Sequence, residues 1–412
     1  MLSAILARFR RESDHFVMMP ETAKRLAISY FLRSAAYPLL SLFTSAYIWQ
    51  TEKNILLLIL YYIGNFVVLP PVFIANKWLL SRISLKKLYA ASVVMTGMSS
   101  LMVVFYEVHT PWAFLGYGIL YGLANGIYWA NRNFLTLRHT TPETRSYFTG
   151  LQFTLSTVSG IVVPFIAGWL IVLMTHQAIV PSVQAAYQVL VAAAFILLLI
   201  AGAVVRGISV HTPELLSRNN RKPFSSSWKQ ARFLSVALGC ADVPLYVLPS
   251  VLILTALGNE GVLGSISSGM AGVTALITYI FGRKYRQRAF YPVFIGLLWS
   301  FIVSGTPLLF GISAFSVLWY VIVANLTDNL IWTANEPKIM DLMDEEVKRS
   351  KVSHYDVIID REWFINIGRV GMYGIFFMLA TIDQTLAMRV TTGVSGVIAL
   401  IGVAMIQREH RR

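Results

Sequence analysis

The chain has 412 residues, of which 56% are hydrophobic and only 13% are charged, and its formal net charge is +14. Soluble domains contain about 25% charged residues, so this composition excludes an ordinary soluble protein and predicts one embedded in a lipid bilayer. The single cysteine, Cys240, excludes an intramolecular disulfide and a cysteine-based zinc cluster. The positive charge suits loops that face anionic lipid headgroups, so we expect membrane lipids and no nucleic acid as partners.

Twelve apolar segments follow one another along the chain, each close to the roughly 20 residues that cross a bilayer core. Residues 1–24 precede them and predict a cytoplasmic amphipathic segment. A polar linker at 207–228 divides a first half, 25–206, from a second half, 229–412, which contains a charged cytoplasmic insert at 338–360 that we expect to form a short surface helix. The spans are predicted at 25–50, 55–75, 88–106, 112–134, 147–174, 183–205, 231–257, 262–281, 290–311, 315–335, 363–382 and 387–406.

The basic residues alternate between the gaps that separate these segments. Of the 34 Lys and Arg residues, all but Arg33, Lys53, Arg369 and Arg389 fall at the start, at the end or in every second gap. This is the positive-inside bias of a multi-pass membrane protein, and it predicts that both termini are cytoplasmic.

Three short matches relate the two halves. The separations are nearly equal, between 203 and 207 residues, and the matches keep their order along the chain. This predicts a parallel duplication of a six-helix unit. The matched segments are Ala36-Tyr37-Pro38-Leu39 with Asp242-Val243-Pro244-Leu245, Ala75-Asn76-Lys77 with Gly282-Arg283-Lys284, and the stripe Asn125, Trp129 and Arg132 with Asp328, Trp332 and Asn335.

Two six-helix halves, a polar linker and cytoplasmic termini together resemble the major facilitator superfamily, whose halves pack around a midplane cavity and rock to expose it alternately. The superfamily motif between the second and third helices, Gly-x-x-x-Asp-Arg-x-Gly-Arg-Lys, is matched only by Asn76 and Lys77 with Arg82 downstream, and Asn76 replaces the motif's Asp. The segment at 141–150, which includes Arg145, is similar to one in the bacterial YqgE-like branch. The resemblance implies a monomer in the bacterial cytoplasmic (inner) membrane, gated near these four residues.

Four charged residues stand out deep inside the predicted spans: Arg33, Asp242, Asp328 and Arg369. A charge in hydrocarbon costs several kcal/mol and persists only with a partner or in a wet cavity. The resemblance places Arg33, Asp242 and Asp328 on helices that line the cavity, with Arg369 nearby. Asp242 and Asp328 are candidates for proton coupling, because a cavity carboxylate can load and release a proton. Alternatively, they pair permanently with the arginines and hold the halves in register.

Aromatic and polar residues share helix faces with these charges. Tyr30, Arg33 and Tyr37 have helical spacing, and Asn366, Arg369 and Tyr373 repeat it. A cation beside tyrosines suits an anionic or hydroxyl-rich ligand, although aromatic residues between helices also serve plain packing. The candidate substrate-binding residues are Tyr30, Arg33, Tyr37, Asn125, Trp129, Trp332, Arg369 and Tyr373.

These features predict a secondary transporter that moves a small solute by alternating access and is driven by protons (H+). A lipid or lipid-linked sugar flippase of the same fold and a non-transporting membrane sensor are the alternatives. An enzyme is not expected, because the seven histidines are scattered without metal-ligand spacing and no phosphate-binding glycine loop is present. We therefore expect no cofactor and no metal.

Overall fold

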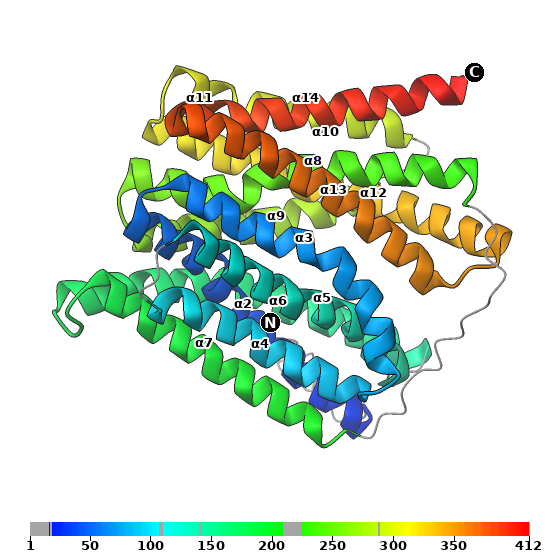
Figure 1. The fold of residues 1–412 in the computed structure, drawn as a ribbon, viewed down its shortest axis with the longest axis horizontal. Helices are drawn as coiled ribbons and strands as arrows, with labels where there is room; N and C mark the ends of the chain where they lie inside the picture. The colour runs from blue at the N-terminus through cyan, green and yellow to red at the C-terminus, as the bar shows by residue number, and fades with distance from the viewer. Residues whose placement is uncertain are drawn as a thin grey trace, which may run out of the picture.

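The computed structural model describes residue 16 and residues 19–106, 110–139, 142–208, 224–286 and 289–411. Within these ranges the protein is a bundle of long helices, and no strand occurs among them (Figure 1). Most of the expected amphipathic segment at 1–24 and most of the linker at 207–228 lie outside the described residues.

Each half of the bundle contains six spans. Eleven helical spans in the described ranges are long and apolar enough to cross a membrane. The twelfth is α5, which hydropathy alone does not identify because it carries Asn125, Asn131 and Arg132. The first half comprises α2 (Glu21–Glu52), α3 (Ile55–Leu80), α4 (Leu85–Phe105), α5 (Pro111–His139), α6 (Pro142–His176) and α7 (Val183–Arg206). The second half comprises α8 (Ser226–Leu257), α9 (Glu260–Lys284), α10 (Phe290–Ser304), α11 (Thr306–Phe310), α12 (Ala314–Ser350), α13 (His354–Ile382) and α14 (Gln384–Arg411).

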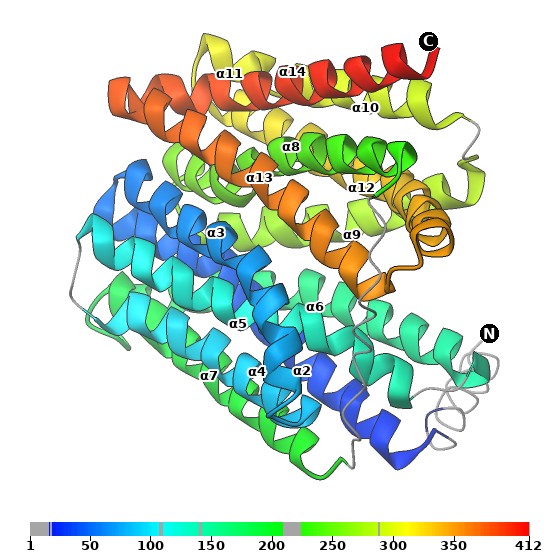
Figure 2. The same cartoon turned by 45° about the vertical axis from the view of Figure 1, so that its right-hand side comes forward.

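The packing partners of the helices repeat between the halves. α2 packs against α6 and α7 as α8 packs against α13 and α14, and α4 packs against α5 and α7 as α10 packs against α12 and α14. Across the halves α6 contacts α9 and α3 contacts α13, which are equivalent pairs under the same correspondence (Figure 2). This arrangement confirms the expected all-α membrane protein with two pseudo-symmetric six-helix halves.

The charged insert expected at 338–360 is not a separate surface helix. α12 runs for 37 residues without a break to Ser350, and α13 starts at His354. The long α12 ends where Lys351 adopts a left-handed conformation with φ 54°. The buried carboxylate of Glu346 accepts hydrogen bonds from Ser225, at the start of α8, and from Ser350, so it attaches the extension to the second half.

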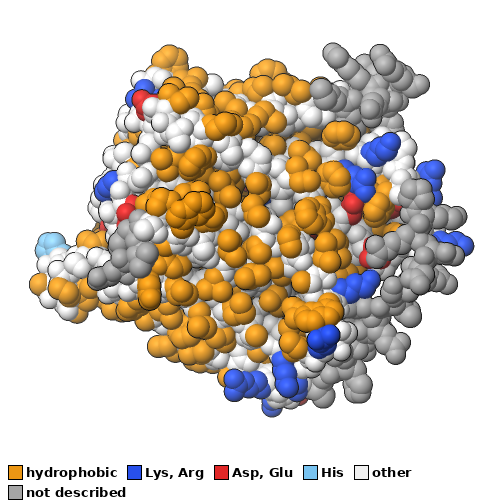
Figure 3. Space-filling view, in the orientation of Figure 1, with side chains coloured by type: hydrophobic (Ala, Val, Ile, Leu, Met, Phe, Trp, Pro, Cys, Tyr) orange, Lys and Arg blue, Asp and Glu red, His pale blue; other side chains and the backbone are white. Residues whose placement is uncertain are grey.

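Basic side chains gather at one end of the bundle, which we call the basic end. It carries the turns at 81–84 and 351–353, and most of the Lys and Arg side chains visible in Figure 3 lie there. The other end, which we call the opposite end, carries the turns at 53–54, 177–182 and 258–259. The described chain therefore has the predicted charge alternation, while the cytoplasmic location of the basic end stays a prediction.

Candidate functional site

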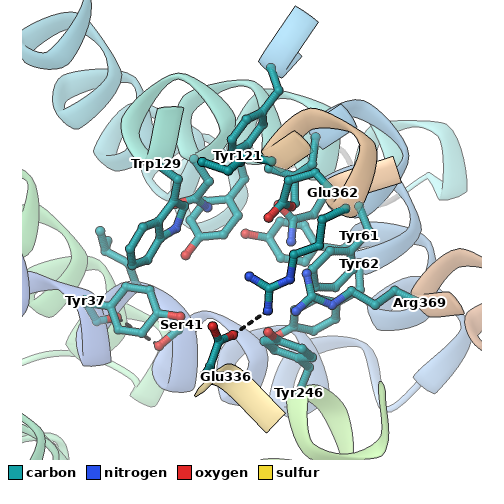
Figure 4. Close-up of a pocket in the computed structure, with 18 of the residues that line it drawn as sticks. Tyr37, Ser41, Tyr61, Tyr62, Tyr121, Trp129, Tyr246, Glu336, Glu362 and Arg369 are labelled. Carbon is teal, nitrogen blue, oxygen red and sulfur yellow. Dashed lines mark hydrogen bonds and ion pairs between the residues drawn. The ribbon is translucent and has the colours of Figure 1, made fainter. Parts of the chain in front are cut away.

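A cavity of about 490 Å³ lies between the two halves (Figure 4). Its wall is formed by α2, α3 and α5 of the first half and by α8, α12 and α13 of the second. The aromatic part of the wall consists of Tyr37, Tyr61, Tyr62, Tyr121, Trp129 and Tyr246. The polar and charged part consists of Ser41, Asn65, Asn125, Glu336, Arg361, Glu362 and Arg369. A wall of this kind can hold a small polar solute through hydrogen bonds and aromatic faces.

The cavity opens toward the basic end. Its most exposed lining residues there are Met340, which is 59% exposed, and Trp129, which is 45% exposed. In the other direction, α2 continues from the cavity with Thr44, Ser45 and Ile48, all of which are buried. Within the described residues, a solute in the cavity is therefore reached from the basic end.

Two of the four predicted intramembrane charges, Arg369 and Asp242, form an ion pair. Arg369 donates from Nε and Nη2 to Oδ2 of Asp242, at 2.9 and 2.5 Å, and Trp332 donates to Oδ1 of the same carboxylate at 3.3 Å. Both charged side chains are buried, so this geometry compensates their desolvation. Asp328, one turn before Trp332 on α12, is half-buried and makes no ion pair among the described residues.

Arg33, the other predicted intramembrane arginine, has no such partner. It is only 6% exposed, and no carboxylate of the described residues lies within 4.0 Å of it. Its Nη2 donates to Oδ1 of Asn125 at 3.2 Å, and its guanidinium lies 3.4 Å from the centre of the Tyr128 ring. The buried Nε has no hydrogen-bond partner. The two buried arginines therefore differ: one is neutralised and one is not.

The structure brings some of the predicted binding residues together and separates others. Arg369, Tyr37, Asn125 and Trp129 line the cavity, and the last three also contact Arg33. Tyr30 does not line it, because its hydroxyl donates to the backbone oxygen of Arg132 at 3.0 Å. Trp332 and Tyr373 lie behind the wall: the first donates to Asp242, and the second stacks on Tyr62 with ring centroids 5.7 Å apart.

A second group of cavity charges was not predicted. Arg361 pairs with Glu336, and Glu362 accepts only a hydrogen bond from the side chain of Asn366, at 3.3 Å, among the described residues. Sequence analysis missed them because the hydropathic span was expected to start at 363, which left them outside the membrane. The spacing of Glu362, Asn366 and Arg369 along one face of α13 is the signal that could have identified Glu362.

The predicted gating residues lie where α3 meets α13 at the basic end. Asn76 exchanges hydrogen bonds with Asn131, at 2.7 and 3.2 Å, and donates to the hydroxyl of Tyr355 at 3.4 Å. Lys77 lies 3.8 Å from a carboxylate oxygen of Asp356. Arg82 instead covers the ring of Trp78 and makes no hydrogen bond or ion pair with the described part of the second half. The side chain of Arg145 lies outside the described residues.

The opposite end is held by contacts that sequence analysis did not predict. The buried carboxylate of Glu260 accepts hydrogen bonds from Gln50 at 3.0 Å and from Tyr187 at 3.1 Å, both of the first half. Next to it, α6 and α9 touch through backbone atoms, because a Cβ added at Gly264 would lie 2.1 Å from the carbonyl oxygen of Pro164. α6 of the first half and α9 of the second thus meet closely at the end where the cavity is closed.

Comparisons with known proteins agree with this architecture. The family model described as Major Facilitator Superfamily matches residues 26–355. The uncharacterized protein YqgE of Bacillus subtilis (strain 168) is 22% identical over 380 residues, which are 90% of this chain and 84% of that protein. The structure is similar to that of the nucleoside transporter NupG, with a TM-score of 0.65, 14% identity and coverage of 93% and 99% of the two chains. It is also similar to a proton dependent oligopeptide transporter, with a TM-score of 0.69, 8% identity and coverage of 94% and 97%.

Proposed function

Because this chain belongs to the Major Facilitator Superfamily, we propose that it is a secondary active transporter that moves a small solute by alternating access. The observation that carries the proposal is the polar cavity between two equivalent halves, which within the described residues is accessible from the basic end. Membership confirms the resemblance seen in the sequence and indicates a transporter, not an enzyme. The distribution of basic residues supports an orientation with the basic end on the cytoplasmic side of a bacterial cytoplasmic membrane.

Alternating access requires the halves to exchange which end is closed. In the second state the Glu260 contacts with Gln50 and Tyr187 separate, and the cavity closes at the basic end. The contacts of α3 with α13 and of α6 with α9 are equivalent, so the halves can rock about them. The two states then expose the same cavity residues to opposite sides of the membrane.

Cysteine labelling tests this motion without knowledge of the solute. Tyr37→Cys in a Cys240→Ser background places one thiol in the cavity wall, since Tyr37 lines it and is 41% exposed. A membrane-impermeant maleimide should reach this thiol from both sides, in inside-out and in right-side-out vesicles. Adding the Gln50→Cys/Glu260→Cys disulfide should abolish labelling from the opposite end only, and reduction should restore it. Labelling that comes only from the basic end, before any cross-link is made, would contradict the proposal and favour a non-transporting sensor.

We further propose that transport is coupled to protons through Asp328, a half-buried carboxylate without an ion pair among the described residues, beside the Arg369–Asp242 pair. Asp328→Asn cannot carry a proton, so it should abolish solute accumulation driven by a pH gradient and leave solute exchange intact. Transport in proteoliposomes measures both activities. Asp344→Asn, which changes an exposed carboxylate, is the matched control. Full proton-driven accumulation by Asp328→Asn would show that another group carries the proton.

A further inference from the structure

We infer that the transported solute is a small zwitterion, whose anionic group is recognised by Arg33 and whose amine is recognised by Glu362. This inference rests on the proposed transport function and adds the chemistry of the solute. It starts from the charges of the two cavity walls, which come from different halves of the protein.

Directly behind the first-half wall lies a cation that forms no ion pair among the described residues. Arg33 is buried, has one hydrogen bond from Nη2 and a buried Nε without a partner, and no carboxylate of the described chain lies within 4.0 Å of it. The Tyr128 ring at 3.4 Å stabilises the guanidinium but does not cancel its charge. A buried charge persists in a membrane when a partner or a wet cavity compensates it. An anion in the adjacent cavity would supply that compensation.

The cavity provides a route to Arg33. Tyr37, Asn125 and Trp129 contact the guanidinium and also form the cavity wall, so Arg33 lies one side chain behind that wall. A carboxylate or phosphate group that displaced Asn125 would meet Nη2 and could also satisfy Nε, because a guanidinium binds such groups through two nitrogens.

The second-half wall contains a carboxylate that is outside the ion pairs of that wall. Glu362 lines the cavity and forms no ion pair within the described ranges. The two neighbouring arginines are already engaged, since Arg361 pairs with Glu336 and Arg369 with Asp242. Figure 4 shows Glu362 and Arg369 on the side of the cavity away from Tyr37 and Trp129. Beside the cavity there are therefore a cation, Arg33 behind the first-half wall, and an anion, Glu362 in the second-half wall, that take part in no ion pair among the described residues.

This arrangement favours a zwitterion over other solutes. A neutral solute would offer no charge to Arg33 or to Glu362, and a simple anion or cation would compensate only one of them. A cavity of about 490 Å³ accommodates a molecule of the size of an amino acid or a short peptide. The aromatic faces can stack on its apolar part.

Capped ligands test the inference. The purified protein would be melted in detergent with each of the twenty amino acids and a set of dipeptides, and with their N-acetylated and C-amidated forms. We expect at least one free zwitterion to raise the melting temperature, and capping at either end to weaken its affinity at least tenfold, which is about 1.4 kcal/mol. Arg33→Gln should remove the preference for a free carboxylate only, and Glu362→Gln the preference for a free amine only.

Three comparisons make the test decisive. Arg283→Gln and Glu345→Gln remove exposed charges that do not line the cavity and should preserve both preferences. Melting each variant without ligand shows whether it still folds. The inference is overturned if no zwitterion stabilises the protein or if a capped form binds as well as the free one. It is also overturned if Arg33→Glu and Glu362→Arg each abolish the cooperative melt and only the double variant recovers it, because the two side chains would then pair with each other. The maleimide experiment succeeds or fails independently, so a failed inference would leave alternating access intact.

Discussion

Different kinds of contact join the two halves at the two ends of their interface. At the opposite end, the buried carboxylate of Glu260 accepts two hydrogen bonds from the first half, and α6 and α9 touch through their backbones. At the basic end, amide and hydroxyl groups join Asn76 to Tyr355, and a partly exposed ion pair joins Lys77 to Asp356. Water competes most for the partly exposed Lys77–Asp356 pair, and the opposite end has in addition the direct backbone approach of α6 and α9. The difference teaches that the state with a closed opposite end is the one that this sequence stabilises.

The largest effect is expected from Gly264→Leu. The new side chain meets the backbone of Pro164, which cannot move aside as a side chain could. It should destabilise the closed opposite end by about 3 kcal/mol and increase labelling of Tyr37→Cys from that end. The control is Gly160→Ala, where the nearest neighbour of an added Cβ is a side-chain atom 3.9 Å away. Equal labelling in both variants would show that the close approach does not hold this end.

A smaller effect is expected from Glu260→Gln. The amide oxygen can still accept one hydrogen bond, but the charge that strengthens the bonds from Gln50 and Tyr187 is lost. We expect a loss of about 1–2 kcal/mol in the stability of the closed opposite end, measured from the melting temperature and the maleimide rate. Gln50→Ala combined with Glu260→Gln should add little to this loss, because both changes affect the same contact. Fully additive effects would contradict the predicted coupling.

At the basic end, Tyr355→Phe should have a modest effect. The hydroxyl donates to the backbone oxygen of Phe73 at 2.7 Å and accepts from Asn76, so its loss removes both bonds between the halves, while Asn76 keeps its hydrogen bonds with Asn131. We expect a destabilisation of about 1 kcal/mol. A thermal melt checks this, with Tyr279→Phe on the exposed surface as the control. A loss larger than that of Gly264→Leu would reverse the ranking of the two ends.

The smallest effect is expected from Lys77→Ala. The ion pair with Asp356 spans 3.8 Å and is partly exposed, so it should contribute about 0.2–1 kcal/mol. Its contribution should decrease with salt, because mobile ions screen exposed charges. Melting wild type and variant at low and high ionic strength measures this, and a difference that does not change with salt would argue against an electrostatic contribution.

Part of the site could be predicted because its residues are charged and lie inside apolar spans. Arg33, Asp242 and Arg369 are conspicuous there, since a charge in hydrocarbon needs a partner or water. Glu362 and Arg361 were missed because hydropathy averages over a window, and the charged start of α13 resembles a loop. Tyr61, Tyr62 and Tyr121 gave no signal, since a tyrosine in a span is equally suited to packing.

Hydropathy, charge alternation and internal repetition determined the twelve spans and the two equivalent halves, because these properties depend on the bilayer and on distances along the chain. Only the tertiary structure decided which charges meet. Asp242 and Arg369 are 127 residues apart and form a pair, while Arg33 behind one wall and Glu362 in the other form no ion pair among the described residues. The reason is that a helix directs a side chain to one face, but the rotation and tilt of neighbouring helices decide what that face meets.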